Sequence, residues 1–151
     1  MNIERIVHSV IAGSLIMVLA GCGTGGTGTT GAMSLFDQLG GMDQIKSLSN
    51  SFVSNLSSDS RTSKLVTNAD KGALTSKLSN QMCALTGGGC SAPLTDSQIA
   101  EGAKKVDPAT TSAVNDSFSK AVSSLTSSPL VKETLTKAVG PKLGGIVGAL
   151  M

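Results

Sequence analysis

Three cysteines and one histidine are the residues of this 151-residue chain whose types most directly suggest metal, haem or disulfide chemistry. They are Cys22, Cys83, Cys90 and His8, and the chain has no Trp and no Tyr. Histidine is the usual general base and the commonest metal and haem ligand. Because His8 lies in an N-terminal segment that we expect to be cleaved off, we do not expect His-based triads, zinc hydrolase sites or c-type haem attachment in the mature protein.

The N-terminal segment has the features of an export signal. An apolar run from Ile6 to Ala20, rich in Val, Ile and Leu, follows the charge pair of Glu4 and Arg5, and it is too short to span a bilayer. The run ends in Leu19-Ala20-Gly21-Cys22, which resembles the lipobox of bacterial lipoproteins. The resemblance implies a signal peptide over residues 1–21 and a diacylglycerol on the Cys22 thiol; the alternative is a buried apolar helix that happens to end in Gly-Cys.

Residues 22–33 are expected to be a lipidated cysteine followed by a flexible linker, because Gly23 to Gly31 contains only Gly and Thr and cannot bury apolar surface. Two or three acyl chains such as palmitate would anchor the protein durably. The absence of Asp after Cys22 resembles lipoproteins sorted to the outer membrane. We therefore expect an extracytoplasmic, lipid-anchored protein, on the outer membrane if the cell has one, with membrane lipid as a partner. The formal net charge is only +2. No run of basic residues in the sequence indicates nucleic-acid binding.

The other two cysteines, Cys83 and Cys90, are separated by six residues that include three consecutive glycines. In an oxidising compartment, a pair this close usually forms a disulfide, and glycine provides the turn geometry that such a short loop needs. Redox or metal-binding thiols are the alternative, but the spacing lacks the compact Cys-x-x-Cys geometry of catalytic thiols.

Residues 34–151 show helical periodicity almost throughout, with no strand-like alternation, which predicts an all-α domain. Capping signals mark three helix starts: Thr95 with Gln98, Asp107-Pro108 and Ser128-Pro129. The last helix is expected to end at Gly140-Pro141, leaving residues 142–151 as a short packed helix or a frayed end. Two further helices are expected over residues 42–56 and 71–86.

The apolar positions of these helices predict the core. The expected inward residues are Ile45, Leu48, Phe52 and Leu56; Leu74, Leu78, Met82 and Leu85; Ile99, Ala103 and Val106; Val114, Phe118, Val122 and Leu125; and Leu130 or Val131, Leu135 and Val139.

The segment Ser34-Leu35-Phe36-Asp37-Gln38-Leu39-Gly40-Gly41, followed by Ile45 and Phe52, resembles the start of group 1 truncated haemoglobins, the two-over-two helical globins. Asp59-Ser60-Arg61 stands where that family often has Asp-Pro-Arg. Residues 74–88 resemble its E helix and residues 114–125 its G helix. The resemblance implies a globin-like, truncated, two-over-two helical domain.

The resemblance also implies where haem would lie, and the haem-contacting positions of the family have changed in this chain. The distal tyrosine falls on Val53, the polar distal residue of the E helix near Lys77 or Leu78, and the proximal histidine on Ala103. The resemblance places the haem pocket between these positions, lined also by Phe36 and Phe52, although both phenylalanines are first of all candidates for the core. Met82 and Cys83 remain as conceivable iron ligands, but a helical Met is more often part of the core.

We therefore expect a haem-free, non-catalytic binding or structural module of the cell envelope, with no metal and no cofactor. Its partner would be an envelope protein or a small apolar ligand. The alternatives are a haem protein with atypical axial ligation that binds oxygen or nitric oxide, and an unrelated helical bundle. Catalysis is not expected, because Ser76 beside Lys77 has no base to activate it. The carboxylate pairs Asp37/Asp43 and Asp96/Glu101 are better explained by helix N-termini.

Overall fold

The computed structural model describes residues 33–151. The expected signal peptide, the expected lipidation site Cys22 and linker residues 22–32 lie outside the described residues.

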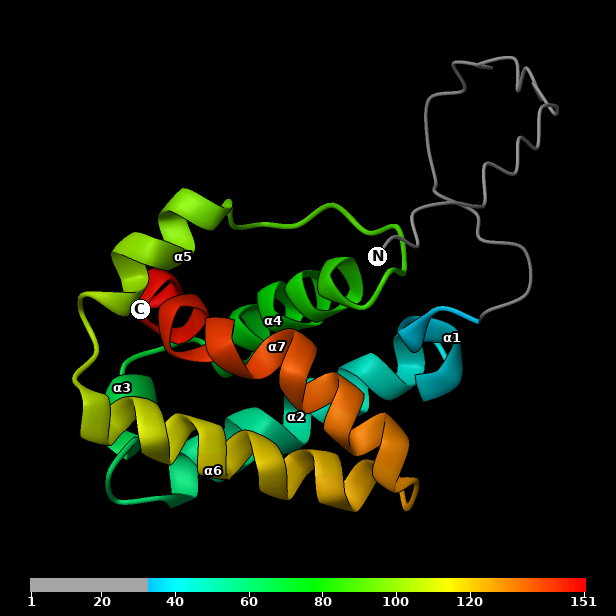
Figure 1. Ribbon diagram of the computed structural model, residues 1–151. Coiled ribbons are helices and arrows are strands. Elements are labelled where there is room, and N and C mark those ends of the chain that lie inside the picture. Colours follow the sequence, from blue (N-terminus) through cyan, green and yellow to red (C-terminus); the bar gives the residue numbers. More distant parts are fainter. Residues whose placement is uncertain (1–32) are drawn as a thin grey trace, which may run out of the picture. The chain divides into compact units, whose positions relative to one another are not determined.

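The described chain is all-helical, as the periodicity predicts, and it contains no strand within residues 33–151. Helices α2 and α4 pack against each other, as do α6 and α7, and α2 also contacts α6 (Figure 1). This is the two-over-two arrangement. The helices are α1 (Leu35–Leu39), α2 (Met42–Ser58), α3 (Ser63–Val66), α4 (Lys71–Leu85), α5 (Asp96–Ala103), α6 (Pro108–Leu125) and α7 (Pro129–Leu150).

The predicted helix starts are confirmed by their capping geometry. Thr95 and Gln98 form a reciprocal capping box at the start of α5. Asp107 accepts a hydrogen bond from the backbone N–H of Thr110, and Ser128 accepts one from that of Val131. In both cases proline occupies the first turn, where its missing N–H costs nothing. Local chemistry therefore decides where these helices begin.

The turn between α1 and α2 requires two glycines. Gly40 and Gly41 have φ angles of 96° and 79°, a region that side-chain-bearing residues rarely adopt. The backbone N–H of Gly41 returns to the carbonyl oxygen of Phe36 at 3.0 Å. The Leu-Gly-Gly element thus turns the chain from α1 directly into α2.

The core forms where the two helix pairs cross. The rings of Phe52 and Phe118 meet edge to face, with centroids 5.5 Å apart, and both side chains are fully buried. Of the two candidates at the start of α7, Val131 is buried and Leu130 is 68% exposed. The structure thus resolves the alternative that periodicity left open.

The expected end of the last helix at Gly140-Pro141 is wrong, because α7 continues through Pro141 to Leu150. Proline inside a helix loses one hydrogen bond and clashes with the preceding turn. The preceding Gly140 has no Cβ to add to that crowding. Beyond the proline, Leu143, Ile146 and Val147 are completely buried, and burying three such side chains contributes several kcal/mol, roughly 1.5–3 kcal/mol each. Packing therefore outweighs the helix-breaking signal.

Helices α5 and α7 approach so closely that their backbones touch. A Cβ on Gly102 would overlap the carbonyl oxygen of Gly145, and one on Gly148 would overlap the carbonyl oxygen of Gly102. The buried residues of α5 are consequently Ile99 and Gly102, while Ala103 is exposed. The expectation that Ala103 faces inward is wrong, because only a residue without a side chain fits at this contact.

We predict that Gly145→Ala destabilises the domain by about 1–3 kcal/mol, since the added methyl group would overlap the carbonyl oxygen of Ile99 and overpacking of this kind costs that much. Urea unfolding followed by circular dichroism measures the effect. Gly72→Ala is the matched control, because a Cβ there meets only a side-chain oxygen of Asp70 at 3.3 Å, so we expect a change below about 1 kcal/mol. Equal effects for the two variants would contradict the close α5–α7 contact.

Candidate functional site

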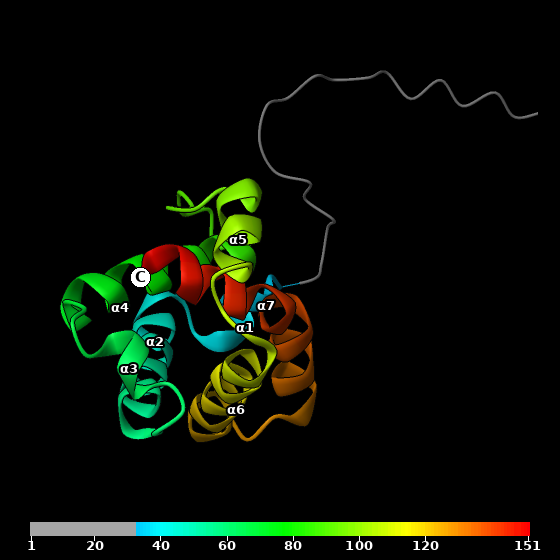
Figure 2. The same ribbon diagram turned by 90° about the vertical axis from the view of Figure 1, so that its left-hand side faces the viewer.

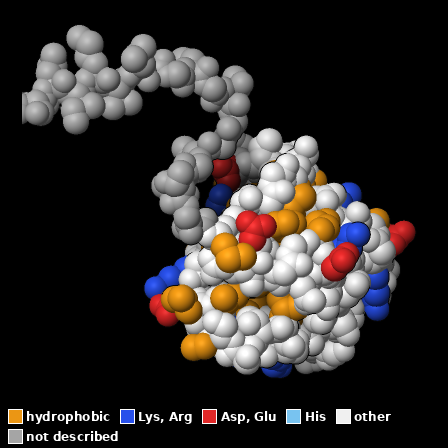
Figure 3. All heavy atoms as spheres, turned by 90° about the vertical axis from the view of Figure 1, so that its right-hand side faces the viewer, with side chains coloured by type: hydrophobic (Ala, Val, Ile, Leu, Met, Phe, Trp, Pro, Cys, Tyr) orange, Lys and Arg blue, Asp and Glu red, His pale blue; other side chains and the backbone are white. Residues whose placement is uncertain are grey.

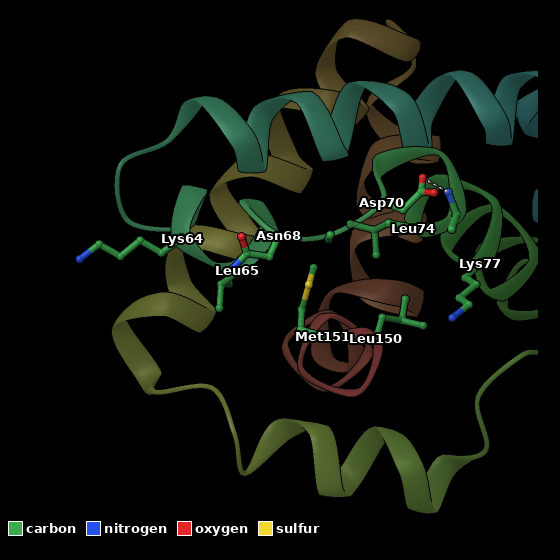
Figure 4. Close-up of a pocket in the computed structure, with 10 residues that line it drawn as sticks. Lys64, Leu65, Asn68, Asp70, Leu74, Lys77, Leu150 and Met151 are labelled. Atoms are coloured by element: carbon green, nitrogen blue, oxygen red, sulfur yellow. Dashed lines mark hydrogen bonds between the residues drawn. The ribbon is translucent and has the colours of Figure 1, made fainter.

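The candidate site is the space between α4 and α5, where the resemblance places haem. In the structure the last turns of α7 lie in this space: α7 contacts α5 extensively along one side and α4 along the other. Figure 2 shows the C-terminal end of α7 below α5 and beside α4, and Figure 4 shows the same end of α7 with α4 and α5 on either side. The buried Leu143, Ile146 and Val147 belong to these turns.

The six residues that the resemblance assigns to the haem pocket do not line a common cavity. Phe52, Val53 and Leu78 are buried in the core, Phe36 is half-buried, and Lys77 and Ala103 are exposed. Of the five surface cavities described below, Lys77 lines one, Val53 lines another, and the other four residues line none.

The cavity that includes Lys77 lies beside the expected pocket. It has a volume of about 450 Å³ and lies between the α3–α4 turn, α4 and the end of α7 (Figure 4). Leu65, Leu74 and Leu150 supply its apolar wall, and Lys64 and Lys77 line it as well. A second, smaller hollow of about 320 Å³ lies between α5 and α7. The remaining three cavities lie along α2.

None of the donors considered as iron ligands is free toward this space. The Met82 side chain is fully buried in the core, and its sulfur accepts a hydrogen bond from the Ser49 hydroxyl at 3.6 Å. Cys83 is bonded to Cys90, and the proximal position holds the exposed methyl group of Ala103. Within residues 33–151 there is also no group of three or more His, Cys, Asp and Glu side chains that could hold a metal ion. Within residues 33–151, the side chains considered as axial ligands therefore do not fit a haem in this space.

Sequence reasoning missed the glycines that bring α7 into this space. Gly102, Gly145 and Gly148 form the α5–α7 contact. A signal was present, since Gly144, Gly145 and Gly148 fall on one side of a helix at spacings of three and four residues. These glycines share one side only if the helix continues beyond Pro141, and the Gly140-Pro141 pair in the sequence predicts that it ends there.

The expected disulfide between Cys83 and Cys90 is present, with their Cα atoms 5.7 Å apart. The loop that it closes holds α1: the backbone N–H of Phe36 donates to the carbonyl oxygen of Thr86 at 2.9 Å. The Phe36 ring packs so closely on Gly88 that a Cβ there would clash with it. Phe36 therefore anchors α1 to the disulfide loop.

A charged cluster fixes the turn after α2. The Arg61 guanidinium donates to both carboxylate oxygens of Asp59, at 3.1 and 2.7 Å, and to Asp116 of α6 at 3.1 Å. The side-chain hydrogen bonds from Arg61 lower the pKa of Asp59 to about 2. The two carboxylates in turn raise the pKa of Arg61 above its usual range. This cluster occupies the Asp-Ser-Arg element of the resemblance, and its role here is to tie the turn to α6.

We predict that the double variant Cys83→Ser/Cys90→Ser unfolds with a free energy lower by about 2–3 kcal/mol, the chain-entropy contribution of a loop this short. Urea unfolding of the variant and of the oxidised wild type measures the difference. Reductant should destabilise the wild type by a similar amount and leave the variant unchanged. A wild type that is insensitive to reductant would contradict a stabilising role for the bridge.

We predict that Arg61→Gln raises the pKa of Asp59 from about 2 toward its ordinary value of about 4, as followed by NMR titration of the side-chain carboxyl. Because the pKa is lowered in the folded state, the stabilisation is complete above about pH 4 and is lost as the pH falls toward 2. The wild type should therefore lose stability across this window more steeply than the variant. Parallel stability profiles would show that the cluster contributes nothing.

No helix within residues 33–151 is both long enough and apolar enough to cross a membrane. No protein-family model matches the chain, and no curated protein matches it.

The solved structures give a clear match. The chain is similar to a truncated haemoglobin from Tetrahymena pyriformis, solved as a tyrosine-to-phenylalanine mutant in the Fe(III) form, with a TM-score of 0.63 and 17% sequence identity. The match covers 71% of this chain and 92% of the haemoglobin. At this identity the likeness concerns the fold. The described domain is therefore an all-α domain with the fold of a truncated haemoglobin.

Proposed function

We propose that the protein is a lipid-anchored, haem-free globin-fold module of the cell envelope that binds a partner rather than catalysing a reaction. The observation that carries this proposal is the position of α7, whose last turns lie between α4 and α5. Side chains of α7 occupy the space where the resemblance places haem, and this supports a packed core in this region in place of a cofactor pocket.

The proximal position supports the same conclusion. Ala103 is exposed, and its neighbour Gly102 is in backbone contact with α7. Placing a ligating side chain at residue 103 would direct it away from the core, and rotating α5 to bring it inward would drive Ala103 into the helix that Gly102 now touches. Loss of the histidine and close packing of α5 on α7 thus go together.

The proposed absence of catalysis is supported by the surroundings of the polar residues. Ser76 and Lys77 are both exposed on α4. The carboxylates of Asp96 and Glu101 do not converge, because Asp96 pairs with Lys142 at 2.8 Å and Glu101 pairs with Lys104 at 2.6 Å. The exposed Ser76–Lys77 pair and the separated carboxylates of Asp96 and Glu101 therefore favour a binding role over catalysis.

The anchoring proposal rests on the lipobox-like sequence at Cys22, and the Cys83–Cys90 disulfide supports it. Structural disulfides persist in oxidising compartments and are rare in the cytosol. A disulfide in this small domain and an export signal at its N-terminus both favour a location outside the cytoplasm.

The proposal is tested by expressing the full chain and its Cys22→Ala variant in a bacterial host that processes lipoproteins and supplies haem. The wild type should fractionate with membranes and carry diacylglycerol on Cys22 by mass spectrometry. The variant should lose both properties while keeping its helical circular dichroism. A wild-type protein that leaves the membrane with salt and carries no lipid would refute the anchor.

The haem part of the proposal is tested on the same material. We expect no Soret band in the purified protein and no stoichiometric complex on titration with haemin. The second candidate function, a haem protein with atypical ligation, is favoured by the haemoglobin match alone. A sharp Soret band that is lost in Met82→Leu would establish it.

A further inference from the structure

Three cavities adjoin one another along the exposed side of α2. Figure 2 shows α2 between α4 and α6. One cavity, of about 450 Å³, lies between α2 and α4, a second of about 370 Å³ also lies between α2 and α4, and a third of about 460 Å³ lies between α2 and α6. Asn50 lines all three, so they form one continuous hollowed surface, which we call the α2 strip.

The α2 strip follows one ridge of the helix. Lys46, Asn50, Ser54 and Ser58 succeed one another at intervals of four residues, which places them on the same side of α2. Twelve residues of helix at 1.5 Å each give the ridge a length of about 18 Å. A linear polymer several units long would lie along it.

Most of the side chains that line the strip carry a hydroxyl or an amide group, and lysine is its only charged residue type. The three cavities contain no Asp and no Glu among their lining residues. Each cavity has one lysine: Lys46 in the first, Lys71 in the second and Lys120 in the third. A repeated arrangement of one cation among hydrogen-bonding groups suits a polymer that repeats an anion among hydroxyl groups.

These three lysines are exposed and form none of the ion pairs found in the described part of the chain, whereas Lys104, Lys137 and Lys142 each bind a carboxylate. Asp59, whose charge reaches Lys120, is already paired with Arg61. The strip lysines are therefore available to an anion from outside.

The α2 residues of the strip also have low helix propensity. Ser and Asn occupy exposed positions of α2 where Glu, Lys or Arg would stabilise the helix better. Asn50 makes none of the side-chain hydrogen bonds found within residues 33–151, whereas Ser58 only returns to its own helix, at the carbonyl oxygen of Ser54. Residues of low helix propensity at exposed positions, with side chains that do not stabilise the fold in return, point to a binding role.

We propose that the α2 strip binds a linear anionic polysaccharide, with the lysines contacting its acidic groups and the hydroxyl and amide side chains contacting its sugar hydroxyls. An apolar partner would leave the three strip lysines without a counter-charge. On the side of the molecule opposite to that of Figure 2, hydrophobic side chains form several small groups, some of them beside Asp or Glu (Figure 3). The inference rests on the proposed non-catalytic binding role, but it requires neither the lipid anchor nor the absence of haem.

The test uses the full chain with its disulfide intact and tetragalacturonate as the probe, with neutral maltotetraose as the comparison ligand. We expect tetragalacturonate to bind, with an affinity that falls as salt rises, and maltotetraose to bind more weakly. The variant Lys46→Gln/Lys71→Gln/Lys120→Gln should weaken binding about tenfold. Calorimetry gives the affinities, and NMR shift changes should concentrate at Asn50 and Ser54.

Matched control variants distinguish the effect of the strip lysines on binding from the effect of a lower net charge. The variant Lys64→Gln/Lys105→Gln/Lys132→Gln removes the same charge away from the strip and should bind nearly as the wild type does. Asn50→Asp places a carboxylate in all three cavities and should weaken binding, whereas Asn68→Asp, on the cavity beside α7, should not. All these residues are polar and none lies in the buried core, so the variants should fold.

Three results would overturn the inference. They are no binding of tetragalacturonate to the wild type, equal losses in the strip and control variants, and strip variants that lose affinity for vesicles of anionic phospholipid but not for the glycan. The last result would identify the strip as a membrane-facing surface. A wild type that is lipid-anchored and haem-free yet ignores tetragalacturonate would refute this inference and leave the proposed function standing.

Discussion

The close contact between the backbones of α5 and α7 is the constraint on which the rest of the domain depends. Gly102 meets Gly145 and Gly148 without side chains between them, which brings the axes of the two helices as near as van der Waals contact permits. The end of α7 is thereby held against α5 on one side and reaches α4 on the other. Leu143, Ile146 and Val147 complete the core from this position.

The truncated haemoglobin fold of the domain does not depend on the positions to which the resemblance assigns haem ligands. The fold is defined by the crossed pairs of long helices, whose contacts centre on Phe52 and Phe118. These contacts do not involve the residues that the resemblance assigns to haem ligation. The helix crossing is therefore maintained without a core contact from residue 103, because Phe52 and Phe118 meet in the core while Ala103 is exposed.

Much of the fold could be predicted from the sequence, because local chemistry determines it. The caps at Thr95, Asp107 and Ser128, the glycine turn after α1 and the buried faces of α2, α4 and α6 follow from residue type and spacing. The course of α7 beyond Pro141 could not be predicted, because the local signal for a helix end is overcome by burial that only the tertiary structure reveals. The inward position of Gly102 depends on that same burial, and so the expectation for Ala103 failed with it. The α2 strip was also missed, because its residues come from three helices whose relative placement the sequence does not specify.

The disulfide loop has a mechanical consequence under the proposed attachment of the domain through its N-terminus. Any pull on the chain enters at Met33 and is transmitted to α1, which is fastened to the loop by the hydrogen bond from Phe36 to Thr86 and by the packing of the Phe36 ring on Gly88. The loop is covalently closed onto α4 by the Cys83–Cys90 bond. While Phe36 stays docked, a load on α1 therefore passes to a loop that the Cys83–Cys90 bond keeps closed on the end of α4, and once α1 detaches the load passes through Gly40 and Gly41 directly to α2.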